Sequence, residues 1–286
     1  MVSWLFSKVL ANRIKLILPN IISDAQSAFV PNRLITDNTT VAFELLHKMR
    51  NKRKGKRGQM AVKLDFSKAY DRVEWLFLWN MMTKLGFDDT WIWLAMETVC
   101  IASYSILING EPCCLVKPTR GIKQGDPLSP YLFLLCAEGL FAMLQRDEAN
   151  RSLKGVVSCQ HGVNISHLLF TDDSLLFCQA TIQECQVLFN ILSQYELASR
   201  QAINHQKTLL FFYRNTRQDT RDSIKNLLGA KIIMDCKKYL GLLMVGGRTK
   251  TTTFKEIQAR VTKRVLGWKE KFISNADREI LIKLIA

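Results

Sequence analysis

The spacing of hydrophobic residues along the chain predicts an alternation of helices and short strands. Leu5, Val9 and Ile14 recur at helical spacing, which predicts a first amphipathic helix that ends at Pro19. A second helical pattern covers residues 37–49. Further helices are expected over residues 73–85, 89–102, 129–145, 181–198, 219–228 and 253–286.

Short apolar runs between these helices predict strands. They cover Met60–Phe66, Tyr104–Asn109, Cys113–Lys117, His167–Thr171, Ser174–Gln179, Thr208–Tyr213 and Tyr239–Val245. Asn109-Gly110 is a strong hairpin turn signal, and Ser129-Pro130 offers an N-cap and a first-turn proline to the helix that follows. Because strands and helices are mixed without regular βαβ alternation, the predicted class is α+β.

Composition and charge narrow the class of protein. Of the 286 residues, 48% are hydrophobic and 23% are charged, which indicates a globular protein with a substantial core. Residues 1–60 contain 11 basic and 3 acidic side chains, and residues 246–286 contain 10 and 4, whereas the middle is nearly neutral. This distribution suggests a polyanion that is held from two sides, and two solvated basic faces explain it equally well.

Cysteine usage and apolar run lengths indicate the compartment. The eight cysteines form no C-x-x-C pair and mostly lie in apolar runs, which predicts buried, reduced thiols. No apolar run reaches the roughly 18 residues that a membrane span requires, and the start of the chain does not resemble a secretory signal. We therefore expect an intracellular protein of the nucleus or the cytoplasm, without a membrane partner. The sequence does not indicate an oligomeric state.

Two aspartate sites interrupt apolar segments. Asp65 follows the strand-like run Met60–Leu64, and Asp172-Asp173 divide a hydrophobic stretch from 168 to 177. A carboxylate pair in such surroundings is expected to be buried, where desolvation and repulsion oppose ionisation unless a cation is present. Mg²⁺ is the natural cation, and three carboxylates suit two ions that promote in-line phosphoryl transfer. An exposed Asp-Asp-Ser turn is an equally good interpretation of the pair.

Four blocks of sequence occur in an order and spacing typical of one family. They are Val62–Trp75 (VKLDFSKAYDRVEW), Arg120–Pro130 (RGIKQGDPLSP), Phe170–Asp173 (FTDD) and Lys238–Gly241 (KYLG). Together they resemble the reverse transcriptase domain of plant LINE-type (non-LTR) retrotransposons. Weaker similarity covers Gln26–Val30 with Arg33, Asp37 and Asn38, and residues 267–283.

The resemblance implies a right-hand polymerase fold. Its palm would be an antiparallel sheet backed by helices. Residues 1–60 would form a fingers fragment, 61–245 the palm with an inserted fingers segment, and 246–286 the start of a truncated thumb. The implied activity is RNA-directed DNA polymerisation, in which deoxynucleotides are added to the 3′-hydroxyl of a DNA primer on an RNA template.

The resemblance also implies the catalytic residues. By position, Asp65, Asp172 and Asp173 match the family's ligands for two Mg²⁺ ions, with Mn²⁺ as an alternative. The main-chain carbonyl of Phe66 would be an additional ligand. Lys207 matches a lysine proposed to protonate the pyrophosphate leaving group, although an ordinary surface lysine is an equally good interpretation.

The nucleotide and the primer have implied contacts as well. Tyr70 matches the aromatic residue that excludes a ribose 2′-hydroxyl; the residue alone would suggest a core aromatic. Gln124 and Gly125 match the loop beside the nucleotide, or equally a helix-capping loop. Arg120 and Lys123 are candidate phosphate contacts or parts of a solvated basic loop. Tyr239-Leu240-Gly241 resembles the hairpin that positions the primer, and a packed strand would look the same.

Departures from the family pattern support an alternative function. Thr171 replaces a common alanine, and Arg200 and Asp277 replace common glycines, at positions that often require a positive φ. The chain is also expected to begin within the fingers and to end early in the thumb. The alternative is therefore a truncated, catalytically inactive remnant that only binds nucleic acid.

Overall fold

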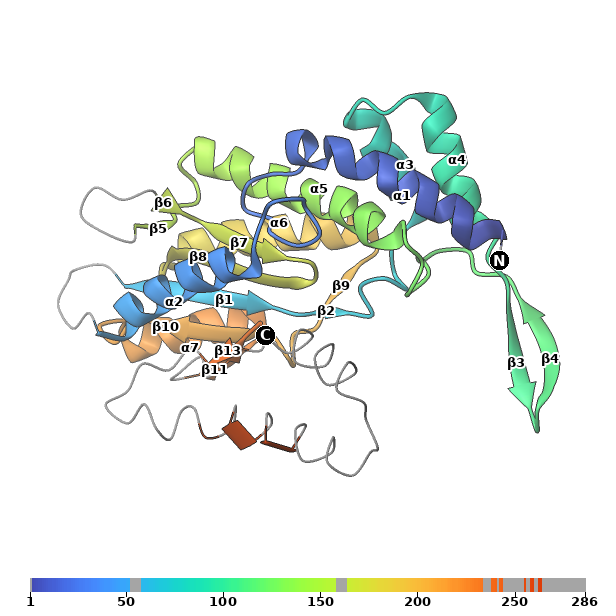
Figure 1. Cartoon of the computed structure of the whole chain (residues 1–286). Coiled ribbons are helices and arrows are strands. Elements are labelled where there is room, and N and C mark those ends of the chain that lie inside the picture. Colours follow the sequence, from blue (N-terminus) through green and yellow to red (C-terminus); the bar gives the residue numbers. More distant parts are fainter. Residues whose placement is uncertain are drawn as a thin grey trace.

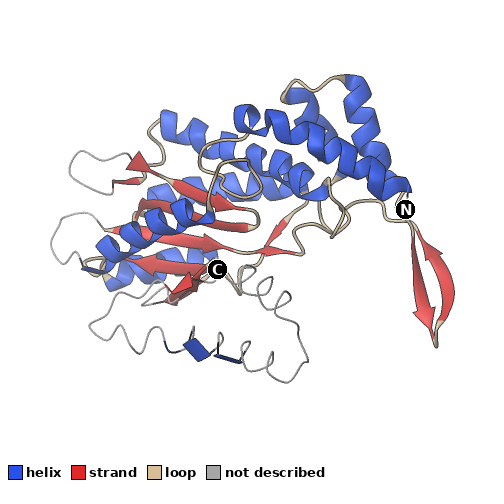
Figure 2. Cartoon of the chain, in the orientation of Figure 1, coloured by secondary structure: helices blue, strands red, loops and turns tan. Residues whose placement is uncertain are grey.

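The computed structural model describes residues 2–51, 58–157, 164–233, 238–240, 242–243, 255, 258–259 and 262–263. These residues combine helices with several small sheets, which confirms the α+β class (Figure 2). The helices are α1 (Val2–Ile21), α2 (Ile35–Asn51), α3 (Trp75–Lys84), α4 (Asp89–Cys100), α5 (Ser129–Ala149), α6 (Ile182–Ser199) and α7 (Gln218–Leu228). The strands are β1 (Gln59–Leu64), β2 (Phe66–Ser67), β3 (Tyr104–Ile108), β4 (Glu111–Val116), β5 (Val156–Val157), β6 (Asn164–Ile165), β7 (His167–Phe170), β8 (Asp173–Gln179), β9 (Ala202–Ile203), β10 (Leu209–Phe212), β11 (Lys231–Ile233), β12 (Lys238–Tyr239) and β13 (Leu242–Leu243).

A five-stranded sheet forms the centre of the molecule (Figure 1). Its strand order is β11-β10-β1-β8-β7, and all neighbours are antiparallel except β10 and β11. Successive residues of β1 face opposite sides of the sheet. Residues on both sides of this strand are buried, so other elements cover both faces of the sheet here. The strand β7 lies at one edge, beside β8.

Two hydrophobic cores pack on the two faces of this sheet. The larger core contains Met60, Val62 and Leu64 of β1, together with buried residues from every helix except α2. The smaller core contains Ala61 of β1 and the buried side of α2, represented by Leu45. The helix α2 therefore covers one face, while α5, α6 and α7 belong to the other (Figure 1).

Two helix ends differ from the sequence prediction. The expectation that Pro19 ends α1 is wrong, because the helix continues to Ile21 and the amide of Ile22 donates to the carbonyl of Leu18 at 2.9 Å. Pro19 removes one helical hydrogen bond, but Leu18 and Ile22 are buried in the larger core and hold the last turn in place. Ser129 is the first helical residue of α5 rather than its N-cap.

The hairpin predicted around Asn109-Gly110 is confirmed. Strands β3 and β4 are paired up to Ile108 and Glu111, and Asn109 and Gly110 between them have φ values of 53° and 90°. This arm projects away from the rest of the protein (Figure 1). Almost every side chain of the arm is exposed.

The predicted burial of the cysteines is confirmed only in part. Three of the six described cysteines are buried, namely Cys136, Cys178 and Cys185, but Cys100 and Cys114 are exposed. Cys114 is exposed because it belongs to the projecting arm β3–β4. All six are free thiols, and Cys159 and Cys236 lie outside the described residues.

The end of the described chain departs from one predicted strand. The strand expected over Tyr239–Val245 is instead a hairpin, in which β12 and β13 pair through Lys238↔Leu243 and Tyr239↔Leu242. Leu240 begins the turn with a φ of 49°. Gly241 and residues 244–245 lie outside the described residues, as does most of the segment expected to form the thumb.

Candidate functional site

The three predicted aspartates come from one end of the central sheet. Leu64, the last residue of β1, is paired with Ser174 of β8, so Asp65 and Asp173 are the next residues on these neighbouring strands. Asp172 lies in the turn that joins β7 to β8, where Phe170 is paired with Asp173. The sheet register therefore brings the backbone of all three aspartates to the same end of the sheet.

These carboxylates are less buried than their sequence surroundings suggest. Asp172 is exposed, and Asp65 and Asp173 are partly exposed. The expectation of a buried pair is wrong because the flanking apolar side chains, such as Leu175 and Leu176, face the two cores and do not enclose the turn. Because these aspartates are in contact with solvent, their carboxylates can stay ionised without a bound cation.

A lysine that the sequence interpretation missed lies at this site. Lys63 lies in β1, two residues before Asp65, which directly follows that strand. Its Nζ is 3.3 Å from Oδ1 of Asp173 and 5.9 Å from the centre of the Tyr239 ring. The available signal was that Lys63 is a lone charge within the apolar run Met60–Leu64.

The donor set fits a hard divalent cation. Carboxylate oxygens are the ligands that Mg²⁺ prefers, although the Lys63 ammonium is paired with Asp173 and would compete with a metal ion for that carboxylate. Within the described residues, no three His, Cys, Asp or Glu side chains lie close enough together to form a complete metal site. A Mg²⁺ ion bound by these aspartates would therefore also need oxygen ligands from water and substrate phosphates. Phe66 could contribute only its main-chain carbonyl oxygen, because Mg²⁺ binds oxygen ligands.

Tyr70 lies close to the aspartate turn and also packs against the core. Its ring is stacked on Phe133 of α5, with the ring centres 5.0 Å apart and the planes 4° from parallel. Burial, together with the negative charge of Asp172, raises the pKa of Tyr70 to about 12. The hydroxyl of Tyr70 is therefore protonated and neutral at physiological pH.

The second sequence block is fixed against the segment that contains Tyr70. The amide of Ile122 donates to the carbonyl of Tyr70 at 2.9 Å, and the amide of Gly121 donates to Val73 at 2.7 Å. Gly121 has a φ of 87°, and a Cβ there would lie 2.7 Å from the carbonyl oxygen of Asp71. Only glycine permits this close approach.

The loop after Gly121 presents the predicted nucleotide contacts to solvent. Arg120, Lys123, Gln124 and Gly125 are all exposed. A pocket of about 400 Å³ lies beside this loop and is lined in part by Asp71, Lys117, Arg120 and Lys123.

Lys207 lies in a turn that is bonded to the aspartate site through the main chain. The amide of Asn204 donates to the carbonyl of Asp65 at 2.7 Å, and the amide of Lys207 donates to the carbonyl of Asn204 at 3.0 Å. The Lys207 side chain is exposed, and it forms no ion pair within the described residues. The fold brings its turn to the site without fixing its ammonium group there.

The predicted primer residues belong to the β12–β13 hairpin. Tyr239 is completely buried in the smaller core, and its hydroxyl donates to Oδ1 of Asn38 at 3.2 Å. Leu240 is partly exposed, and Gly241 lies outside the described residues. The buried side chain of Tyr239 therefore anchors the hairpin to the smaller core.

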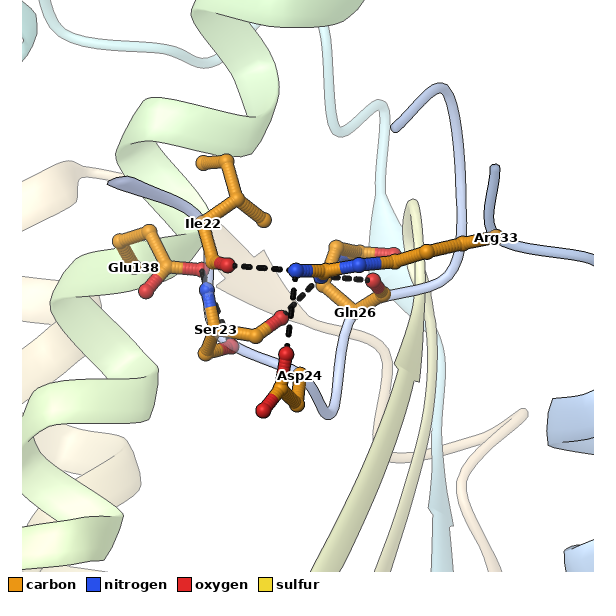
Figure 3. Close-up of polar contacts among 6 residues, drawn as sticks. All are labelled: Ile22, Ser23, Asp24, Gln26, Arg33 and Glu138. Carbon is orange, nitrogen blue, oxygen red and sulfur yellow. Dashed lines mark hydrogen bonds and ion pairs between the residues drawn. The ribbon is translucent and has the colours of Figure 1, made fainter. Parts of the chain in front are cut away.

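A loop that precedes α2 contacts the aspartate turn, because Gln26 accepts a hydrogen bond from the amide of Thr171. Arg33 holds this loop through several hydrogen bonds (Figure 3). The Arg33 guanidinium donates to the carbonyls of Ile22 and Gln26 at 3.0 and 2.7 Å, and pairs with Asp24 at 3.2 Å. It also donates to the carbonyl of Ser23. The amide and hydroxyl of Ser23 both donate to Glu138 of α5 at 3.1 Å.

Burial raises the pKa of Glu138 to about 7, although the two hydrogen bonds from Ser23 oppose that shift. The hydrogen bonds from Ser23 attach the loop to α5, and those from Arg33 hold the loop in its own conformation.

Comparison with known proteins gives the family. The family model described as "Reverse transcriptase (RNA-dependent DNA polymerase)" matches residues 4–244. The chain therefore belongs to the reverse transcriptase family.

Individual relatives agree with this assignment. The chain is 27% identical to a 149 kDa transposon TX1 protein of Xenopus laevis, over 96% of this chain and 20% of that protein. It is 33% identical to a type-1 retrotransposable element R2 polyprotein of Popillia japonica, over 40% of this chain and 18% of that protein. An uncharacterized mitochondrial protein of Arabidopsis thaliana is 46% identical over 27% of this chain and 62% of its own length. The resemblance to non-LTR retrotransposons is confirmed, and the chain spans about a fifth of the two transposon proteins.

A solved structure confirms the polymerase fold. Telomerase from Candida tropicalis, in complex with a fragment of telomeric RNA, superposes with a TM-score of 0.52 at 12% identity. The superposition covers 73% of this chain and 33% of that chain. No helix among the described residues of the present chain is long and apolar enough to span a membrane.

Proposed function

We propose that this chain is the polymerising part of a non-LTR retroelement protein and that it copies an RNA template into DNA. The observation that carries the proposal is the meeting of three sequence blocks at one site. Asp65 directly follows β1 and Asp173 begins the neighbouring strand β8, Asp172 lies close to Tyr70, and the amide of Ile122 donates to the Tyr70 carbonyl. Each block belongs to the segment that matches the reverse transcriptase family.

The aspartates carry the central role in this proposal. Asp65, Asp172 and Asp173, with the Phe66 carbonyl, would hold two Mg²⁺ ions or, alternatively, Mn²⁺. When bound, such ions neutralise charge on a triphosphate and favour ionisation of the primer 3′-hydroxyl. Lys207 would donate the proton of its Nζ to the departing pyrophosphate.

The other predicted residues would select and orient the substrates. Tyr70 would lie beneath the sugar of the deoxynucleoside triphosphate, where its ring leaves no space for a 2′-hydroxyl. Gln124 and Gly125 would contact the nucleotide through the amide and the main chain. Arg120 and Lys123 would bind phosphates, and the hairpin at 239–241 would position the primer end.

The charge distribution supports an RNA template and a DNA primer as partners. Residues 1–60 would form part of the fingers, 61–245 the palm, and 246–286 the beginning of the thumb. The outer two segments carry most of the net positive charge. Two basic walls around an acidic floor suit a nucleic-acid duplex whose phosphates are gripped on the outside. We place this activity inside the cell, in the nucleus or the cytoplasm.

Primer extension on an RNA template tests the proposal. Replacing Asp172 by asparagine removes one carboxylate charge, and loss of several kcal/mol of transition-state stabilisation corresponds to about a 10³-fold slower reaction. Asp89→Asn provides the matched control, because Asp89 is an exposed aspartate at the start of α4. Its activity is expected to equal that of the wild type.

The same experiment distinguishes the alternative function. A wild-type chain that binds the template–primer but incorporates no deoxynucleotide, at any tested Mg²⁺ or Mn²⁺ concentration, would identify an inactive remnant. Equal incorporation by the wild type and Asp172→Asn would instead reject the assigned site.

A further inference from the structure

The segment that precedes α2 adds to the edge of the central sheet beside the aspartate turn. The amide of Leu169 in β7 donates to the carbonyl of Ala25 at 2.9 Å, and the amide of Ser27 donates to the carbonyl of Leu169 at 3.2 Å. Gln26 and Leu169 form a parallel bridge between these two bonds. The segment therefore covers the open edge of β7 only two residues before the turn at Thr171.

Gln26 extends this contact to the turn itself. Its side chain has no exposed surface, and its Oε1 accepts hydrogen bonds from the amides of Ala28 at 3.0 Å and Thr171 at 3.3 Å. Thr171 has a φ of 52°, a conformation that is costly for a β-branched residue. The bond from Gln26 restrains this residue, and Thr171 sets the direction in which Asp172 leaves the sheet.

Asn38 joins the same strand to the β12–β13 hairpin. It is 3% exposed, in the first turn of α2, and its Nδ2 donates to the carbonyl of Leu169 at 2.9 Å and to Oγ of Ser27 at 3.1 Å. Its Oδ1 accepts the hydroxyl of Tyr239. The side-chain amide of Asn38 thus donates two hydrogen bonds to the sheet edge and accepts one from the β12–β13 hairpin.

We propose that Gln26 and Asn38 are positioning residues that hold the aspartate turn and the β12–β13 hairpin in a fixed relative arrangement. Both amides are withdrawn from water, and apolar side chains would fill the same space without that cost. The bonds they form end on the two hairpins to which the proposed function assigns the metal ligands and the primer. The role in catalysis rests on that proposed function, whereas the structural restraint does not.

Each variant removes a different hydrogen bond of Gln26 or Asn38, so the contributions of the two residues can be measured separately. Gln26→Met keeps the side-chain length and removes the acceptor for Thr171. Tyr239→Phe removes only the hydroxyl that reaches Asn38, while Asn38→Asp keeps that acceptor and loses the donor to Leu169. Gln186→Met is the matched control, because Gln186 is an exposed glutamine of α6.

The first readout is amide hydrogen exchange, which needs no catalytic activity. Exchange in residues 168–173 is expected to accelerate about tenfold in Gln26→Met and in Asn38→Asp, and to stay unchanged in Gln186→Met. Exchange around residue 239 is expected to accelerate in Tyr239→Phe. Melting temperatures recorded in parallel identify any variant that fails to fold, and Tyr239→Phe is the mildest change.

The second readout separates the two hairpins kinetically. Tyr239→Phe is expected to raise the KM for primer several-fold with little change in kcat, since it loosens the primer hairpin. Gln26→Met is expected to lower kcat and to raise the Mg²⁺ concentration that gives half-maximal rate. The double variant Asn38→Asp with Tyr239→Phe is expected to lose less than the two single losses combined, because both changes affect one connection.

Unchanged exchange in folded Gln26→Met and Asn38→Asp would overturn the proposal. Accelerated exchange with wild-type kinetics would also overturn the positioning role. An inactive wild type would reject the proposed function instead, and exchange would still decide whether the amides hold the two hairpins.

Discussion

Two hairpins with two-residue turns, β3–β4 and β7–β8, are held together in opposite ways. The turn of β3–β4 is Asn109-Gly110, and both residues have the positive φ values that such residues adopt at low cost. The turn of β7–β8 begins at Thr171, for which a φ of 52° is unfavourable. The first hairpin is almost entirely exposed, whereas strand β8 is buried over Ser174–Cys178.

The difference shows where each hairpin obtains its stability. Local turn chemistry and strand pairing specify β3–β4, which projects from the protein without covering a core. Tertiary contacts specify β7–β8, because Gln26 binds Thr171 and both sheet faces pack against other elements. The hairpin proposed to carry chemistry is thus the one whose turn the surrounding protein holds in place.

The largest difference between the hairpins is expected in catalysis. Asp173 and Glu111 occupy equivalent positions, each as the first residue after its turn. Asp173→Asn is expected to slow primer extension about 10³-fold, because a proposed metal ligand loses its charge. Glu111→Gln is expected to keep wild-type activity. Comparable losses in both variants would contradict the separation of roles.

A buried and an exposed leucine should differ next in their effect on stability. Leu169 of β7 is 1% exposed, and Leu107 of β3 is 68% exposed. Leu169→Ala is expected to reduce the free energy of unfolding by about 2–5 kcal/mol, through lost burial and a cavity. Leu107→Ala is expected to change it by less than about 0.5 kcal/mol. Urea denaturation measures both, and a similar cost at the two sites would show that the projecting arm packs in solution.

Acid should destabilise β7–β8 through His167. Burial lowers the pKa of His167 to about 4, and the nearby Glu148 carboxylate offsets only part of that effect. The unfolded chain therefore binds this proton more readily, so stability falls as pH decreases from 6.5 toward 4, by about 3 kcal/mol in total.

Urea denaturation of the wild type and of His167→Gln across this pH range tests the assignment. The variant is expected to lose this contribution to the acid slope, and an unchanged slope would place the sensitivity elsewhere. The β3–β4 arm contains no histidine and is expected to contribute nothing.

Local sequence signals predicted both hairpins and most helices. The family resemblance implied a positive φ at Arg200, and this residue does end α6 with a φ of 57°. Burial of the aspartate pair was predicted wrongly, because hydrophobic neighbours in sequence face the two sides of a sheet and leave its end open. The hydrophobic pattern predicts which strand residues face a core. It does not predict whether the turn that follows the last paired residues is covered or open to solvent.

The connections around the site had no local signal at all. The bond from Thr171 to Gln26 joins residues 145 positions apart, and the bond from Tyr239 to Asn38 joins residues 201 apart. Which segment adds to the edge of β7 is decided only when the whole sheet forms. A lone Lys63 within an apolar strand was visible in the sequence, but its ion pair with Asp173 depends on the register of β1 against β8.

The smallest expected effect comes from exchanging the two turn residues. Asn109→Thr places a β-branched residue at a φ of 53° in a hairpin whose strands are almost entirely exposed. It is expected to cost about 1 kcal/mol locally, seen as faster hydrogen exchange over residues 104–116 with little change in melting temperature. Thr171→Asn is expected to stabilise β7–β8 by about 0.5 kcal/mol, since asparagine tolerates positive φ. Its gain is small because the Thr171 hydroxyl, which donates to the carbonyl of Phe170 at 2.7 Å, is lost. A larger cost at Thr171 than at Asn109 would mean that this hydroxyl, rather than the backbone conformation, determines the turn.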